Sequence, residues 1–138
     1  LGQVLLSGDD VYKLVGSLSG GERAKVAFAV MMLERGNVLI LDEPTSGLDP
    51  VSRDELMELF RGVVKSGERS ILFSTHITSD LEKCASHITM IKDGQILCSD
   101  TRTGFLARYR AQFGDGQMSL EDILVRVERR SYDSEDFL

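Results

Sequence analysis

The sequence predicts an α/β fold in which parallel strands carry polar residues at their carboxyl ends. Two short, continuous apolar runs, residues 38–41 and 71–73, have the length and composition of parallel strands covered on both faces. The segment between them has apolar residues at helical spacing. A strand, a helix and a second strand in this order indicate a parallel sheet.

A helix is expected to begin near Gly21 and to end at residues 36–37. Ser19, followed three residues later by Glu22, forms a capping box in which each side chain bonds a backbone amide of the helix start. Apolar residues on most sides of this helix predict that it is buried: Val26, Ala27, Ala29, Val30 and Leu33.

The rest of the chain is predicted to contain four more helices and a hairpin. Asp49 and Pro50 have the character of the N-cap and first residue of a helix, and a shorter helix is expected over residues 78–85. Apolar runs 88–91 and 95–98 flank an Asp-Gly step, which favours a β-hairpin. From residue 101 onward we expect two helices separated by residues 114–116, the second amphipathic over residues 119–130, and an acidic tail. The predicted division is a domain of residues 1–100 and a helical extension of residues 101–138.

Composition narrows the possible functions. The 138 residues are 42% apolar, enough for a core, and their net charge of −6 gives no basic surface for nucleic acid or anionic lipid. No apolar run approaches the roughly 20 residues that span a bilayer. Cys84 and Cys98 do not form a C-x-x-C motif and are expected to be reduced thiols of a cytosolic protein. Because the first residue is Leu1, we expect an excised or truncated piece of a longer product.

Three residues whose side chains can take part in catalysis or metal binding follow the two predicted strands. Asp42 and Glu43 end the first strand and His76 follows the second, where open α/β sheets place ligands. Neighbouring residues of an extended strand face opposite sides, so the two carboxylates are expected to take different roles. The alternatives are solvated acids at a strand end and a structural histidine, which is our interpretation of His87.

The run from Leu18 to Glu22 has the character of an anion site. Ser19, Gly20 and Gly21 present a hydroxyl and backbone amides at a helix N-terminus, and the missing glycine side chains would allow a phosphate to approach. Capping alone would explain Ser19 and Glu22. A phosphate-binding G-x-x-x-x-G-K-[S/T] motif occurs nowhere in the 138 residues.

These motifs, in this order, resemble a known family. Residues 17–98 resemble the C-terminal half of an ABC-type ATPase domain, with signature motif, Walker B motif, D-loop and switch histidine in family order. The resemblance implies a partial P-loop NTPase fold with mainly parallel strands, without the P-loop strand and helix. It also implies ATP and Mg²⁺ as cofactors, and an isolated chain that is inactive because it has no P-loop.

The resemblance implies a role for each motif residue. Asp42 would hold Mg²⁺ through water, Glu43 would act as general base, and His76 would contact the γ-phosphate. The signature residues would complete the ATP site of a partner domain: Ser19, Gly20, Gly21 and Glu22. The D-loop residues, Ser46 and Asp49, would touch the same partner. A helix cap alone would also explain Asp49.

Two branches of the family are represented. Residues 1–45 resemble the second ATPase domain of ABC-F proteins, soluble factors that act on ribosomes, whereas residues 46–138 resemble ATP-binding subunits of bacterial exporters. The chain is therefore interpreted as an exporter ATPase fragment, with a hybrid origin, an ABC-F fragment and a noncatalytic assembly piece as alternatives. The expected partners are a second ABC ATPase domain and a membrane permease, at the inner face of the cell membrane. Direct nucleic-acid contact is expected only of an ABC-F protein.

Overall fold

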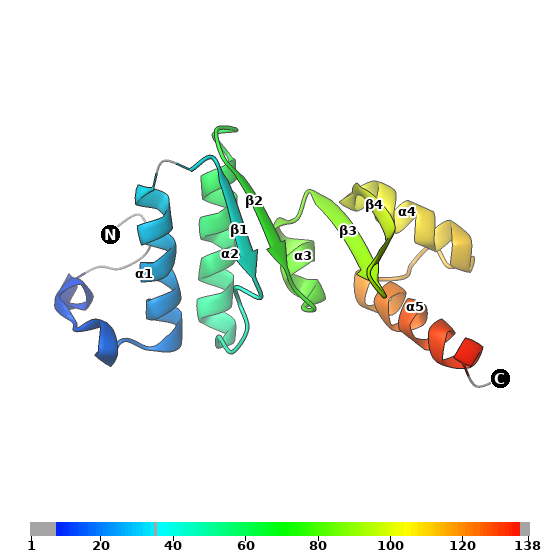
Figure 1. Ribbon diagram of the computed structural model, residues 1–138, viewed down its shortest axis with the longest axis horizontal. Coiled ribbons are helices and arrows are strands. Elements are labelled where there is room, and N and C mark those ends of the chain that lie inside the picture. Colours follow the sequence, from blue (N-terminus) through cyan, green and yellow to red (C-terminus); the bar gives the residue numbers. More distant parts are fainter. Residues whose placement is uncertain (1–7, 35, 136–138) are drawn as a thin grey trace. The chain divides into compact units, whose positions relative to one another are not determined.

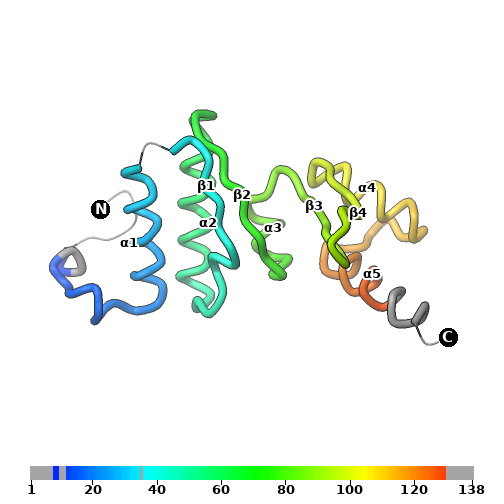
Figure 2. The backbone as a smooth tube through the Cα atoms, viewed as in Figure 1, coloured from blue at the N-terminus to red at the C-terminus, as the bar shows by residue number. Residues whose placement is uncertain are grey.

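The chain folds into two compact units. The computed structural model describes residues 8–34 and 36–135, and the units are Leu1–Ile77 and Thr78–Leu138. Residues 1–7, where the ABC-F-like stretch begins, lie outside the described residues, as do the last three residues of the acidic tail. Figure 1 shows the elements in chain order, and Figure 2 traces the same path of the backbone.

The first unit is built around two parallel strands. It contains the 3₁₀ turns η2 (Gly8–Tyr12) and η3 (Val15–Ser17), the helices α1 (Gly20–Leu33) and α2 (Pro50–Val64), and the strands β1 (Val38–Asp42) and β2 (Ser70–Ser74). The strands pair in parallel, from Val38 opposite Ser70 to Asp42 opposite Ser74. The α/β class and the parallel pairing are confirmed, and the pairing brings Asp42 next to Ser74.

Aromatic side chains hold the helices of this unit against its sheet. The ring of Phe60 on α2 lies 5.2 Å from that of Phe28 on α1 and 5.8 Å from that of Phe73 on β2, between ring centroids. Buried Lys25 of α1 also forms an ion pair with Glu55 of α2. Figure 1 shows α1 and α2 side by side, which these contacts explain.

The prediction that both strands are covered on both faces is wrong in this structure. Ile40 is 75% exposed and Leu72 is 63% exposed, while the alternate residue Leu39 is buried. Helices of the first unit pack on one face of the two-stranded sheet, and no described element of this unit covers the other face. The prediction that α1 is buried holds for only one stripe of the helix, because Val30 and Leu33 are exposed.

The second unit combines a hairpin with helices. It contains α3 (Thr78–Cys84), β3 (His87–Lys92), β4 (Gln95–Thr101), α4 (Arg102–Phe113) and α5 (Leu120–Glu135). β3 and β4 pair antiparallel, as the Asp-Gly step predicts. Asp93 and Gly94 both have a positive φ, the left-handed conformation that a two-residue hairpin turn demands.

One core unites the hairpin with α4 and α5. Its buried members come from β3, β4, α4 and α5 and from the loop before α5: Ile88, Met90, Cys98, Phe105, Tyr109, Met118, Leu120 and Ile123. The amphipathic character predicted for residues 119–130 is confirmed, since Leu120 and Ile123 are buried and Leu124 and Val127 pack beside them. The compact unit therefore begins at Thr78, ahead of the hairpin, whereas the sequence places the division at residue 100.

Within residues 8–34 and 36–135, no helix has the length and apolar character that a membrane crossing requires. Among these residues, Cys84 and Cys98 are not joined in a disulfide.

Candidate functional site

The ends of β1 and β2 form a polar cluster in the first unit, which we call the strand-end cluster: Asp42, Glu43, Ser74 and His76. The Ser74 hydroxyl donates to Oδ1 of Asp42. The backbone amide of Glu43 donates to Oγ of Ser74 at 3.1 Å and to its carbonyl oxygen at 3.2 Å. Nδ1 of His76 lies 2.9 Å from Oε1 of Glu43. The structure therefore brings together the three residues that the sequence selects at the strand ends.

Glu43 does not continue the strand. The expectation that strand alternation turns Asp42 and Glu43 to opposite sides is therefore wrong. β1 ends at Asp42, and Glu43 has a φ of +44°, in the left-handed region. That conformation costs a residue with a side chain about 1–2 kcal/mol. The two carboxylates are thus separated by a turn of the backbone, which Ser46 closes by donating its amide to the Glu43 carbonyl at 3.0 Å.

The Glu43 carboxylate is only partly satisfied. Oε1 contacts His76, whereas Oε2 is buried and has no hydrogen-bond partner among the described residues. An orphaned buried carboxylate oxygen is costly in a stable fold and calls for an explanation. Because Oε2 is buried, a water or ligand could supply the missing partner only if the Glu43 side chain moved.

His76 lies on the open side of the cluster. Its side chain is 76% exposed, and its contact with Glu43 uses only Nδ1. Nε2, on the other edge of the ring, remains accessible to a ligand. Ser74 is the one member of the cluster that was not predicted as a site residue. The sequence does contain a signal for it: if the two apolar runs pair in parallel, Ser74, which follows the second run, lies near Asp42, which follows the first.

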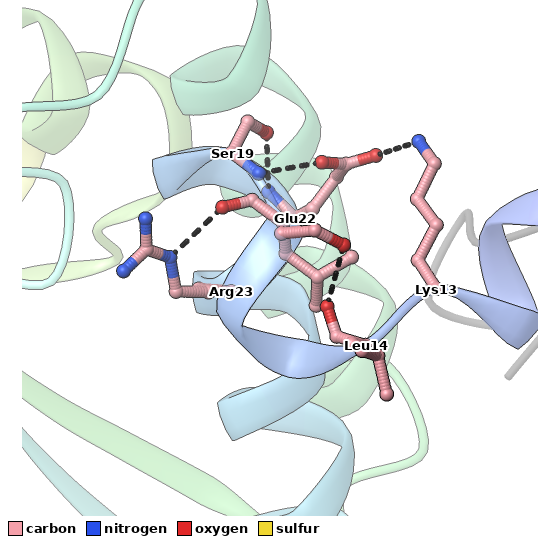
Figure 3. A network of polar contacts seen from close by, with 7 residues as sticks. Lys13, Leu14, Ser19, Glu22 and Arg23 are labelled. Carbon is pink, nitrogen blue, oxygen red and sulfur yellow. Dashed lines mark hydrogen bonds and ion pairs between the residues drawn. The ribbon is translucent and has the colours of Figure 1, made fainter.

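The signature residues form a second polar network at the start of α1 (Figure 3). Ser19 Oγ accepts from the Glu22 amide at 3.2 Å, and Glu22 Oε2 accepts from the Ser19 amide at 2.6 Å, so the capping box is confirmed. Lys13 donates to Oε1 of Glu22 at 2.9 Å. Arg23 Nε donates to the carbonyl of Leu18 at 3.0 Å. The Ser19 hydroxyl and the Glu22 carboxylate are thus engaged in the fold itself.

Glu22 is expected to make stability depend on pH. The Ser19 amide, followed by Lys13, lowers the pKa of Glu22 from 4.5 to about 2. A lowered pKa stabilises the folded state fully above pH 4.5, and this contribution is lost as the pH falls toward about 2. The free energy of unfolding of wild type minus that of Glu22→Gln, measured by urea titration, should therefore shrink between these pH values. A difference that stays constant over that range would contradict this assignment.

Gly21 has a packing reason for lacking a side chain. A Cβ on Gly21 would lie 2.0 Å from Oγ and 2.5 Å from Cβ of Ser52 on α2, whereas a Cβ on Gly20 would meet nothing closer than 3.9 Å. The structure thus explains Gly21 by the close approach of α1 and α2. Gly20 carries no such packing restraint and is the glycine for which a ligand explanation remains.

The D-loop residues lie on the turn between β1 and α2. Asp49 caps α2, accepting from the amides of Val51 and Ser52 at 3.0 and 3.1 Å and from the Ser52 hydroxyl at 2.6 Å. The Ser52 hydroxyl contributes most to lowering the pKa of Asp49. The helix-cap explanation therefore holds for Asp49, while Ser46 is exposed on the turn.

The strand-end cluster is compatible with a hydrated Mg²⁺. Among the described residues there is no group of three or more His, Cys, Asp and Glu side chains that could enclose a metal ion. Mg²⁺ typically keeps several waters and takes one or two carboxylates, so a closed cage is not required. Asp42 is exposed, and no described residue bonds its Oδ2.

The α/β fold with its parallel sheet is that of part of a domain of the P-loop NTPase class, which the family match implies. More narrowly, the chain belongs to the ABC transporter family of ATP-binding domains. The family model described as "ABC transporter" matches residues 1–46, and curated relatives align with up to 91% of the chain.

Curated relatives include importers and other transporters. The energy-coupling factor transporter ATP-binding protein EcfA2 of Enterococcus faecalis is 41% identical over 80 residues, which are 58% of this chain and 28% of that protein. The bacitracin transport ATP-binding protein BcrA of Bacillus licheniformis is 30% identical over 125 residues, 91% of this chain and 40% of that protein. The thiamine import ATP-binding protein ThiQ of Chelativorans sp. is 35% identical over 95 residues, 69% of this chain and 39% of that protein. The chain thus spans less than half the length of these relatives.

Proposed function

We propose that the chain is part of the ATP-binding subunit of an ABC transporter and supplies the hydrolytic side of an ATP site. The observation that carries this proposal is the strand-end cluster, in which Ser74 bonds both Asp42 and Glu43 and His76 contacts Glu43. The family membership gives this cluster its chemistry, since phosphoryl transfer depends mainly on positioning and on stabilising charge at the phosphate.

Each residue of the cluster has a distinct role in this proposal. Asp42 holds the hydrated Mg²⁺, which when bound neutralises charge on the β- and γ-phosphates. Glu43 orients the attacking water and accepts its proton. His76 keeps Nδ1 on Glu43 and presents Nε2 to the γ-phosphate.

The signature residues serve a different ATP. By family geometry, Ser19, Gly20 and the first amides of α1 face the nucleotide of a second ABC ATPase domain, because a helix N-terminus favours an anion. Glu22 supports this end through its bonds to Ser19 and Lys13. Ser46 on the D-loop turn would face the same partner. A membrane permease is the further partner, which places the assembled subunit at the cytoplasmic face of the membrane.

Export is the transport direction that we propose. The support for this direction is that residues 46–138 resemble exporter subunits. The likeness of residues 1–45 to ABC-F proteins favours, as a second candidate, a soluble ribosome-associated ATPase. An upstream gene segment that encodes another complete ATPase cassette would favour that candidate, and a neighbouring permease gene would favour the exporter.

ATP binding by the 138-residue chain is expected to be very weak. The sequence has no P-loop lysine and no amide nest for the β- and γ-phosphates. Equilibrium dialysis should therefore detect no saturable ATP binding by the chain alone. The control is the same chain joined at its N-terminal end to a segment of the family that carries G-x-x-x-x-G-K-[S/T], which we call the completed domain. Equally tight binding by both proteins would reveal an unrecognised phosphate site and contradict the proposal.

A further inference from the structure

The Ser74 side chain joins the two carboxylate residues of the strand-end cluster. A serine hydroxyl has one proton to donate and two lone pairs that accept. Here the proton goes to Oδ1 of Asp42, and a lone pair accepts the amide of Glu43 at 3.1 Å. One oxygen atom on β2 therefore fixes both the last residue of β1 and the residue that follows it.

We propose that Ser74 is a positioning residue for ATP hydrolysis: its hydroxyl orients the Asp42 carboxylate and holds Glu43 in the turned conformation that carries its side chain to His76. This inference rests on the function proposed above for the cluster. It adds a residue that touches neither the metal nor the phosphate in that proposal and that acts through the two carboxylates.

The backbone alone does not replace this hydroxyl. The Ser74 carbonyl also accepts from the Glu43 amide, at 3.2 Å, and that contact survives any substitution of the side chain. No other described residue is shown bonding the Asp42 carboxylate. A carboxylate torsion is broad and roughly twofold, so without the hydroxyl the group is free to turn. Loss of Ser74 Oγ should thus disorder Asp42 more than it disorders the β1–β2 pairing.

Glu43 needs the second acceptor for a different reason. Its positive φ is unfavourable for a residue with a side chain, and such conformations persist where surrounding contacts over-determine them. The shared amide contact with Oγ and the carbonyl of Ser74, together with the Ser46 amide on the Glu43 carbonyl, provides those contacts. Without Oγ the conformation is held less firmly, and the Glu43–His76 contact should weaken.

The local part of the inference is tested in the 138-residue chain by NMR. Ser74→Ala should shift the Glu43 amide resonance and remove the cross-peak between the Glu43 side chain and the His76 ring. Ser74→Thr should leave the amide resonance at its wild-type position and keep the cross-peak. Ser70→Ala is the matched control, because Ser70 lies on the same strand and face and is exposed. Unchanged Glu43 and His76 resonances in Ser74→Ala would overturn the inference. If Ser74→Ala fails to fold, Ser74→Val is compared with Ser74→Thr. The two side chains have nearly the same shape, but only threonine has the hydroxyl, so only Ser74→Val should lose the Glu43–His76 cross-peak.

The catalytic part is tested by steady-state ATP hydrolysis in the completed domain. Ser74→Ala should lower kcat on the order of tenfold while KM stays within about twofold, because misplaced groups cost rate and the phosphate grip lies elsewhere. Ser74→Thr should restore kcat, and Ser70→Ala should match wild type. If Glu43→Gln abolishes turnover but Ser74→Ala leaves kcat unchanged, the positioning role is wrong and the proposed function stands. If Glu43→Gln hydrolyses ATP at the wild-type rate, the general-base role of Glu43 in the proposed function fails.

Discussion

Replacing Glu43 by Gln is expected to lower ATP turnover by the completed domain by at least about 100-fold, the scale on which a general base contributes. Glutamine keeps the shape of the side chain but has no basic oxygen to accept the proton of water. ATP binding should be retained, since the phosphates are gripped by the P-loop segment. The measurement is kcat from phosphate release, with ATP affinity determined separately.

The matched control for this change is Glu68→Gln. Glu68 is exposed in the bend before β2, so the substitution makes the same change in charge away from the strand-end cluster. Its turnover should equal that of wild type. Wild-type turnover by Glu43→Gln would show that another group accepts the proton, and the base assignment would then be wrong.

Gly21→Ala is expected to destabilise the 138-residue chain by about 1–3 kcal/mol, the usual cost of inserting a methyl group into a packed contact. The new Cβ would lie 2.5 Å from Cβ of Ser52. Rotating the Ser52 side chain relieves the hydroxyl but not this atom, because the backbone fixes Cβ. The helices α1 and α2 must therefore separate. Urea titration of the chain without nucleotide measures the effect.

Gly20→Ala provides the comparison at the neighbouring position. Its Cβ would have an ordinary contact with Leu48 at 3.9 Å, so stability should be unchanged or slightly raised. Equal stability of Gly21→Ala and wild type would show that α1 and α2 adjust without cost, and the packing explanation of Gly21 would then fail. In the completed domain, by contrast, Gly20 remains a candidate for contact with a partner's nucleotide.

Local features of the fold were predictable because short-range chemistry determines them. The capping box of Ser19 and Glu22, the N-cap at Asp49 and the Asp-Gly hairpin turn each depend on residues within three or four positions. The parallel pairing of β1 and β2 was predictable from their continuous apolar runs. These features sufficed to bring Asp42 and His76 to the same end of the sheet.

Burial could not be predicted in the same way. A continuous apolar run shows that a strand is suited to cover on both faces, but it does not provide the covering elements. Ile40 and Leu72 remain exposed because the helices of the first unit pack on the opposite face. The division before the hairpin likewise depends on which helices its apolar face meets, and β3 and β4 share their core with α4 and α5.

The detailed geometry of the strand-end cluster also required three-dimensional information. The positive φ of Glu43 runs against its residue type, and the Ser74 hydroxyl gains its two contacts only from the exact register of β1 and β2. A shift of one residue would turn Ser74 to the other face of the sheet. The sequence thus indicated the chemistry of Asp42, Glu43 and His76, while the structure revealed the group that links them.

The central claim is that this chain carries the hydrolytic half of an ATP site and depends on a P-loop from elsewhere. ATP turnover by the chain alone and by the completed domain, each with and without Asp42→Asn, tests it most directly. We predict turnover by the completed domain only, and its loss in Asp42→Asn, because in the proposed function that carboxylate holds the metal. Turnover by the chain alone that disappears in Asp42→Asn would contradict the claim.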